Sequence, residues 1–332
     1  MIDNIVSGFT FVRLFTHSAL IAAFLFGLAM LAGDSRAATV VNDTWIDETD
    51  DDPAAPTYSE NGADTDGDGD IESAWFQGGD GTLDPVAGDG AGPLRGEFSS
   101  PTGGSSATWT TYFTPEGSEI NLTNPGDTLK LTWVFTPRGV NASNTSQNFR
   151  IALVDSPSAA RITENGSPDS AAYTGYGIFA NMGETLGNSN PFRLMERADD
   201  SGAILSSSGE WSGLGVTGAT QNNDGYDSGT EYTFMMTFMR TAAGELQIDT
   251  SMTGGTLDND GTAEVSFLDA TPNGGSFQFD TFSIRPSGAS TTAALFDTSL
   301  FRVEFTRVPE PTSLLLFGIG AAAMSIPVRH RK

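Results

Sequence analysis

The feature that most constrains the fold of this chain is an alternation of apolar and polar residues with a period of two. It is clearest in 129–135 and 232–238, and it recurs in 149–153, 246–249 and 301–305. Successive side chains of a β-strand point to opposite faces, so this pattern predicts strands that each place one face in a core. No long amphipathic helix is indicated between the two hydrophobic ends of the chain.

The positions predicted to face the core follow from this alternation. They are Leu129, Leu131, Trp133 and Phe135; Tyr232, Phe234, Met236 and Phe238; Phe149, Ile151 and Leu153; Leu246 and Ile248; and Phe301, Val303 and Phe305. In 277–284 the alternation slips at Asp280-Thr281, which predicts a β-bulge. Weaker strand candidates are 39–45, 74–77, 107–113, 175–181 and 192–196.

Turn-forming residues separate these strands, as at 124–127 (Asn-Pro-Gly-Asp), 243–244 (Ala-Gly) and 272–275 (Pro-Asn-Gly-Gly). About a dozen strands joined in this way predict an all-β fold, a jelly-roll-like antiparallel β-sandwich. We expect one such domain over residues 38–307, flanked by an N-terminal signal helix and a C-terminal hydrophobic helix.

The body of the chain is strongly acidic. The whole sequence has 42 acidic and 16 basic residues. Without the two ends, residues 38–308 keep 39 acids against 11 bases, a net charge of −28. Nucleic acid and anionic membranes are poor partners for such a surface, whereas divalent cations, cationic polymers and neutral sugars are suitable ones.

The body contains neither cysteine nor histidine, since the only histidines are His17 and His330. This excludes Ser-His-Asp and Cys-His catalysis, and it excludes thiolate or imidazole metal sites. A glycosidase can work with two carboxylates alone. However, Glu245-Leu-Gln-Ile-Asp249 lacks the tight Glu-x-Asp-x-Glu spacing of concanavalin-like glucanases. We therefore expect no enzymatic activity.

Residues 1–37 are typical of a signal peptide for the Sec export machinery. A mildly polar start ending at Arg13 precedes a continuous apolar stretch within 18–31, and Ala37 and Ala38 are small residues suited to cleavage. The alternative is a retained membrane anchor. In both cases the body is exported.

The other end of the chain combines three features in order. Pro309-Glu310-Pro311 cannot be helical, an uncharged run of 15 residues covers 314–328, and 329–332 reads Arg-His-Arg-Lys. This resembles the PEP-CTERM sorting signal of bacterial surface and exopolysaccharide-associated proteins. The resemblance implies an exosortase-like processing enzyme, transient inner-membrane anchoring by a short transmembrane helix, and then a cell-surface or extracellular-matrix location. The alternative is a buried core helix with a polar tail.

The order of segments in the body also resembles a class of PEP-CTERM proteins with a jelly-roll, concanavalin-like body. The matching segments are Trp75-Phe76, 112–115 (Tyr-Phe-Thr-Pro), 149–153 (Phe-Arg-Ile-Ala-Leu), 173–176 (Tyr-Thr-Gly-Tyr) and 279–284 (Phe-Asp-Thr-Phe-Ser-Ile). This resemblance implies a fold and a destination, and it implies no catalytic residues.

The strongest candidate for chemistry is a Ca²⁺-binding loop at 64–72. Its carboxylates are Asp64, Asp66, Asp68, Asp70 and Glu72, spaced as in an EF-hand loop with Gly69 at the sharp turn. Trp75 stands where an EF-hand has its bidentate carboxylate, and no helical pattern flanks the loop, so a strand-to-strand loop is expected. The acidic run 47–52 could add ligands. The alternative is a solvated acidic turn.

Sugar binding is a second hypothesis. Aromatic platforms and polar donors on a sheet face suit a carbohydrate. The candidates are Trp109, Tyr173, Tyr176, Trp211 and Tyr226, with Arg150 or Arg193 as donors. We therefore expect an exported structural or adhesive protein, with carbohydrate binding to exopolysaccharide as the alternative and a glycan-active enzyme as a third.

Overall fold

A computed structural model describes residues 37–86, 95–100, 105–198, 201–205, 208–275 and 277–309. The predicted signal peptide up to residue 36 and the hydrophobic run 314–328 lie outside these residues. Within the described ranges, no helix is long and apolar enough to cross a membrane. Residues 37–307 form a compact unit of their own.

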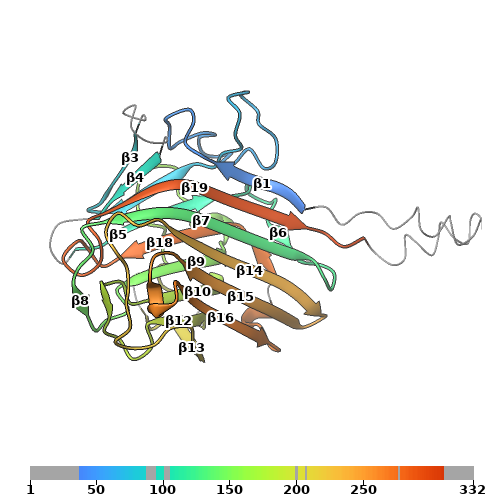
Figure 1. The fold of residues 1–332 in the computed structure, drawn as a ribbon. Coiled ribbons are helices and arrows are strands. Elements are labelled where there is room, and N and C mark those ends of the chain that lie inside the picture. Colours follow the sequence, from blue (N-terminus) through green and yellow to red (C-terminus); the bar gives the residue numbers. More distant parts are fainter. Residues whose placement is uncertain are drawn as a thin grey trace, which may run out of the picture. The chain divides into compact units, whose positions relative to one another are not determined.

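The described residues of the body form two large antiparallel sheets (Figure 1). The eight-stranded sheet has its strands in the order β16 (Thr262–Asp269), β15 (Glu245–Thr253), β14 (Tyr232–Ala242), β7 (Thr128–Arg138), β19 (Leu295–Thr306), β4 (Arg95–Ser99) and β3 (Thr82–Val86), with β1 (Ala37–Asp43) also paired to β19. Strand β19 therefore pairs with three neighbours, and a register shift between Thr298 and Leu300 separates the part bound by β4 from the part bound by β1.

The second sheet has seven strands among the described residues. Their order is β13 (Trp211–Thr217), β12 (Phe192–Arg197), β10 (Thr174–Ala180), β9 (Phe149–Asp155), β18 (Thr281–Pro286), β5 (Ala107–Tyr112) and β2 (Trp75–Gly79). The chain crosses between the sheets repeatedly, because β14–β16 return to the eight-stranded sheet before β18 joins the other.

Short elements complete the described structure. They are the pairs β8 (Ser143–Asn144) with β11 (Thr185–Leu186) and β6 (Ile120–Asn121) with β17 (Gln278–Phe279), and the 3₁₀ turns Ser158–Ala160, Leu257–Asn259 and Asn273–Gly275. Asp280 separates β17 from β18, at the position where the sequence predicted a break in the alternation.

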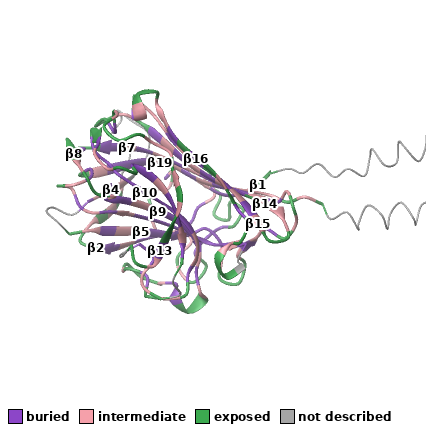
Figure 2. Ribbon diagram, turned by 90° about the horizontal axis from the view of Figure 1, so that it is seen from below, coloured by how far each residue is buried: buried purple, intermediate pink, exposed green. Residues whose placement is uncertain are grey.

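The main core lies between the sheets, and Figure 2 shows buried residues concentrated on the strands. The alternating residues predicted to face inward are buried in it, for example Trp133, Phe234 and Val303, each with no exposed surface. Phe305 is only partly buried against this core. A smaller apolar cluster covers the outer side of the seven-stranded sheet and includes Phe179, Met195 and Trp211.

The predicted all-β antiparallel sandwich is confirmed. The sequence analysis missed the longer strands β3, β4, β13 and β16, and also the two-residue strands β6, β8 and β11. Strand β13 reads Trp-Ser-Gly-Leu-Gly-Val-Thr, and its glycines hide the alternation. Strand β3 contains Pro85, which is tolerated because β3 lies at the edge of its sheet.

Candidate metal centre

The acidic residues singled out from the sequence lie in a long loop, residues 44–74, that joins β1 to β2. Figure 1 shows this acidic loop in blue beside β1. Isolated bridges Asn42–Ile71 and Ser59–Ser73 fix its second half. Trp45 and Tyr58 have φ angles of 63° and 65°, a region that costs energy for such residues. The acidic loop is thus held in a specific and partly strained conformation.

Nine carboxylates of this region come together in four overlapping groups, each with oxygens within 4.8 Å of one another. The groups are Asp43, Asp70 and Glu72; Asp47, Asp52 and Glu72; Asp66, Asp68 and Glu72; and Glu60, Asp64 and Asp66. Glu72 belongs to three of the four groups, so it is the centre of the arrangement. We call these nine residues the carboxylate cluster.

Backbone hydrogen bonds determine how the acidic loop presents its side chains. Asp64 accepts from the N–H of Gly67 at 2.6 Å, Asp66 from that of Asp68 at 3.1 Å, and Asp68 from that of Asp70 at 3.1 Å. Each of these bonds uses one oxygen of the carboxylate and leaves the other free for a ligand. Gly69 has a φ of 117°, so the sharp turn does require glycine there.

Three carboxylate oxygens of the cluster are buried without any hydrogen-bond partner. They are Oδ2 of Asp68, Oδ1 of Asp70 and Oε2 of Glu72. Asp70 and Glu72 are each only 3% exposed. Among the described residues, no Lys or Arg forms an ion pair with any member of the cluster. A buried anionic oxygen without a partner is costly, so these atoms favour a bound cation as their partner.

The electrostatics of the site agree with this geometry. Burial raises the pKa of Glu72 to about 10, and the charges of Asp47 and Asp43 add to the rise. Burial also raises the pKa of Asp43 well above its ordinary value, although hydrogen bonds from Trp45 and Trp75 oppose the rise. Hard oxygen ligands are those that Ca²⁺ and Mg²⁺ prefer, and Ca²⁺ takes six to eight of them. The donor set fits a divalent cation of this kind.

A second contact region holds the acidic loop against the sandwich. The ring of Tyr58 lies 5.1 Å from that of Tyr112 in β5, and the hydroxyl of Ser59 donates to the carbonyl of Phe113 at 3.0 Å. The guanidinium of Arg161 lies 5.3 Å from the Tyr58 ring and 5.0 Å from the Tyr112 ring.

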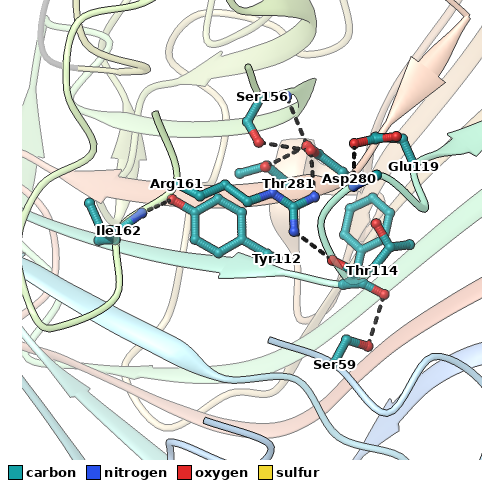
Figure 3. Close-up of polar contacts among 11 residues, drawn as sticks. Ser59, Tyr112, Thr114, Glu119, Ser156, Arg161, Ile162, Asp280 and Thr281 are labelled. Carbon is teal, nitrogen blue, oxygen red and sulfur yellow. Dashed lines mark hydrogen bonds and ion pairs between the residues drawn. The ribbon is translucent and has the colours of Figure 1, made fainter. Parts of the chain in front are cut away.

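Figure 3 shows the polar network around Arg161. Its guanidinium donates to Asp280 and to the carbonyl of Thr114, both at 2.7 Å, and the side chains of Arg161 and Asp280 are 1% and 0% exposed. Asp280 also accepts from the backbone N–H and the hydroxyl of Ser156. This buried pair joins the segment after the 3₁₀ turn Ser158–Ala160 to the residue before β18, and it holds the Arg161 guanidinium beside Tyr58 of the acidic loop.

All five predicted metal ligands lie in the carboxylate cluster, although no single group contains them all. The structure adds Asp47 and Asp52, which the acidic run indicated, and also Asp43 and Glu60, which the sequence analysis missed. Glu60 accepts from the backbone N–H of Glu72 at 3.1 Å. Asp43 ends β1, and only the pairing of β1 with the loop brings it near Glu72; no local spacing signals that approach.

The predicted sugar-contacting aromatics lie in the interior. Trp109, Tyr173, Tyr176, Trp211 and Tyr226 are each at most 5% exposed. They therefore form no exposed aromatic platform. Arg150 and Arg193 are half-buried on the outer side of the seven-stranded sheet.

A polar groove of about 350 Å³ lies on the outer face of β14, β15 and β16. Two cross-strand rows line it, Thr237–Asp249–Ser266 and Met235–Ser251–Glu264. Asp249 accepts from the hydroxyl of Ser266 at 2.6 Å and from the amide of Gln247 at 2.9 Å. Hydroxyls and carboxylates thus face solvent here without an aromatic ring.

The fold and the carboxylate cluster together define an antiparallel β-sandwich protein with a carboxylate-rich loop between β1 and β2. Residues 307–332 match the PEP-CTERM protein-sorting motif, so the chain carries the C-terminal sorting signal of an exported protein. No curated protein matches the chain.

Several solved structures resemble the body. The carbohydrate recognition domain of Emp47p is 15% identical with a TM-score of 0.40, over 72% of this chain and 90% of that one. The VIP36 exoplasmic/lumenal domain, in a Ca²⁺/Man3GlcNAc-bound form, is 12% identical with a TM-score of 0.39, over 71% and 86%. Peanut lectin is 9% identical with a TM-score of 0.36, over 70% and 93%. Because these TM-scores are below 0.5, the fold assignment rests on strand order and register.

Proposed function

We propose that this is a Ca²⁺-dependent structural or adhesive protein of the cell surface or extracellular matrix. The Sec machinery would export it, and an exosortase-like enzyme would process it at Pro309-Glu310-Pro311 after transient anchoring in the inner membrane. The match of residues 307–332 to the sorting motif supports the export route. Catalysis is not part of the proposal, because the body has neither His nor Cys.

The observation that carries the calcium proposal is the set of unpartnered, buried oxygens on Asp68, Asp70 and Glu72. A Ca²⁺ ion beside Glu72 would take these oxygens as ligands, and Asp43, Asp47 or Asp66 would complete the set. The ion would thereby connect the end of β1 to both halves of the acidic loop. Binding would convert mutual repulsion into coordination.

The energetic consequence is stabilisation of the folded state by RT ln(1 + [Ca²⁺]/Kd), about 2.7 kcal/mol at a hundredfold excess over Kd. The absence of the last EF-hand ligand by itself predicts an affinity in the weak extracellular range, with a Kd of about 10⁻⁴–10⁻³ M. Asp43 brings a further carboxylate to the groups around Glu72. We therefore expect a Kd at or below about 10⁻⁴ M, since affinity rises with ligand charge.

The test is a thermal melt of residues 37–307 in chelator, in about 10 mM Ca²⁺ and in Mg²⁺ at equal ionic strength. Wild type should melt higher with Ca²⁺, and Asp70→Asn with Glu72→Gln should abolish that rise while melting no lower in chelator. The matched control is Asp51→Asn, an exposed acid of the same loop that belongs to none of the four groups. If Ca²⁺ and Mg²⁺ shift the wild type equally, or neither does, the loop is a solvated acidic turn.

A second candidate function is carbohydrate binding, and the groove on β14–β16 is the observation that favours it. Its hydroxyls and carboxylates can hydrogen-bond a neutral sugar, and Met239 and Leu268 continue the same face with exposed apolar surface. The exopolysaccharide of the producing cell is the expected ligand.

A glycan array probed with residues 37–307, with and without Ca²⁺, tests this candidate. Asp249→Ala with Glu264→Ala should remove a signal that depends on the groove. Asp258→Ala with Asp260→Ala removes the same charge from the turn before β16 and should leave the signal unchanged. Equal binding by both double variants would place the ligand elsewhere on the surface.

A further inference from the structure

Three arginines lie in one row across the outer side of the seven-stranded sheet. Arg285 of β18 stands directly opposite Arg150 of β9, Arg150 stands opposite Phe179 of β10, and Phe179 stands opposite Arg193 of β12. The neighbours Ile151 and Ile284 belong to the main core, so Arg150 and Arg285 point away from it.

The contacts of these arginines do not neutralise them. Arg285 donates to the hydroxyl of Ser106 at 2.7 Å, and Arg150 donates to the carbonyl of Leu205 at 2.8 Å. The guanidinium carbon of Arg150 lies 4.6 Å from the centre of the Phe179 ring. Arg193 lies against Gly213, where a Cβ atom would come within 1.9 Å of its Nη2.

Within the described residues, none of the three has a carboxylate within 4.0 Å, and Nε of Arg150 is buried without a hydrogen-bond partner. The charge of Glu210 acts on Arg150, yet the two form no ion pair, and Oε2 of Glu210 is itself buried without a partner. Both arginines of the opposed pair are half-buried.

Like charges directly opposite each other on neighbouring strands destabilise a sheet. Burial lowers the pKa of Arg150 to about 10, and the charge of Arg285 contributes, so Arg150 remains protonated at neutral pH. Burial also lowers the pKa of Arg285. What distinguishes Arg150 and Arg285 is that two unpaired arginines stand directly opposite each other on neighbouring strands. Lys130, Arg138 and Arg161 each pair with a carboxylate.

We propose that Arg150 and Arg285 bind an acidic polysaccharide, each through its own carboxylate or sulfate. A planar guanidinium can hold such a group through two parallel N–H bonds. The two side chains lean apart, Arg150 toward Phe179 of β10 and Arg285 toward Ser106 before β5, so each can take a separate anion, and bound anions would relieve the repulsion. Arg193, farther along the row, would favour a further charged sugar. The polysaccharide must carry widely spaced charges, because the acidic surface of the protein repels a densely charged polyanion. At physiological salt, dissolved ions weaken this repulsion only over distances greater than about 8 Å.

The experiment uses residues 37–307, which carry their own core, in constant Ca²⁺. The probe is a hyaluronan oligosaccharide, which has a carboxylate on every second sugar, and dextran is the neutral comparison. Isothermal titration is made with wild type, Arg285→Gln, Arg150→Gln with Arg285→Gln, and the control Lys130→Gln with Arg302→Gln. The control removes the same charge from the outer face of the other sheet. Thermal melts without sugar confirm that each variant is folded.

Wild type should bind hyaluronan but not dextran. Arg285→Gln should weaken binding about tenfold, the double variant should abolish it, and the control should stay within about twofold of wild type. Glu210→Gln should strengthen binding, because it removes a competing negative charge. The proposal is overturned if the folded double variant binds as wild type does, if dextran binds equally, or if wild type does not bind. Free sulfate that binds where the oligosaccharide does not would overturn the polysaccharide assignment.

Discussion

The carboxylate of Asp43 contacts the indole of Trp75 in the interior of the protein. Oδ2 of Asp43 accepts from Nε1 of Trp75 at 3.4 Å, while its other oxygen accepts from the N–H of Trp45 at 2.9 Å. The Trp75 ring packs in turn against Phe98 at 5.0 Å and Phe301 at 5.1 Å, which belong to the eight-stranded sheet. A metal ion bound at the carboxylate cluster would therefore be linked through Asp43 to Trp75, which is a residue of the main core.

This contact makes tryptophan fluorescence a reporter of the metal site. Ca²⁺ added to the wild-type body should change the fluorescence, because Trp75 donates to a residue of the cluster. Trp75→Phe should remove most of that change and lower the free energy of unfolding by about 1–3 kcal/mol, since it leaves an oxygen of Asp43 unpaired. Trp211→Phe, in the outer apolar cluster, should keep the change. An undiminished response in Trp75→Phe would separate the metal from this contact.

The long alternating strands could be predicted from the sequence because each has one face in a single core. Leu129, Leu131, Trp133 and Phe135 alternate with exposed or half-buried partners along β7, and burial follows the same phase. Two of the aromatic residues expected to contact a sugar are buried because the outer side of their sheet is covered as well. Tyr173 and Trp211 lie on the outer side of their sheet, but other parts of the chain cover them there. Alternation alone does not reveal that second layer.

The carboxylates of the proposed metal site divide in the same way. Asp64 to Glu72 could be found because their spacing is local, and one stretch of loop presents them together. Asp43 is separated from Glu72 by 28 residues, and only the bridge between Asn42 and Ile71 brings them together. Long-range contacts of this kind leave no periodic signal in the sequence.

The buried pair of Arg161 and Asp280 should be essential for stability. Arg161→Met leaves the charge of Asp280 buried without its partner, and such changes cost about 3–5 kcal/mol. Chemical denaturation in chelator measures the loss. Lys130→Met breaks a pair with Glu304 whose side chains are 44% and 27% exposed, and it should cost less than about 1 kcal/mol. Comparable losses in the two variants would contradict a special role for the Arg161 pair.

Asp155 should make stability depend on pH. Burial, followed by the charge of Asp280, raises its pKa from 3.8 to about 7. Between about pH 4 and 7, Asp155 therefore stays protonated in the folded state, whereas it is ionised in the unfolded chain. The resulting stabilisation is complete below about pH 4 and is lost as the pH rises through 7.

The amide side chain of Asp155→Asn does not ionise in this pH range. The variant should therefore be as stable as wild type near pH 4 and more stable than wild type at pH 8. Each 1 kcal/mol gained should raise the Tm by about 2–4 °C. Melts in chelator over this pH range, compared with those of the exposed-site variant Asp169→Asn, check the difference. A gap between Asp155→Asn and wild type that is constant with pH would rule out titration as the cause.

Export and processing can be tested in the producing cell. Replacement of Pro309-Glu310-Pro311 by alanines should leave the protein membrane-bound and unprocessed, because this sequence is the element that an exosortase-like protease is proposed to recognise. Intact-mass spectrometry of the exported wild-type protein should find a C-terminus upstream of Lys332. Detection of the complete C-terminus on exported protein would refute the processing step.

The most direct test of the account is a calorimetric titration of residues 37–307 with Ca²⁺ at neutral pH, with Glu72→Gln as the paired variant. Glu72 is shared by three of the four carboxylate groups. The account predicts saturable binding to wild type with a Kd at or below about 10⁻⁴ M, and at least a tenfold loss of affinity in Glu72→Gln. No saturable binding up to about 10 mM Ca²⁺, or equal affinity in the two proteins, would contradict it.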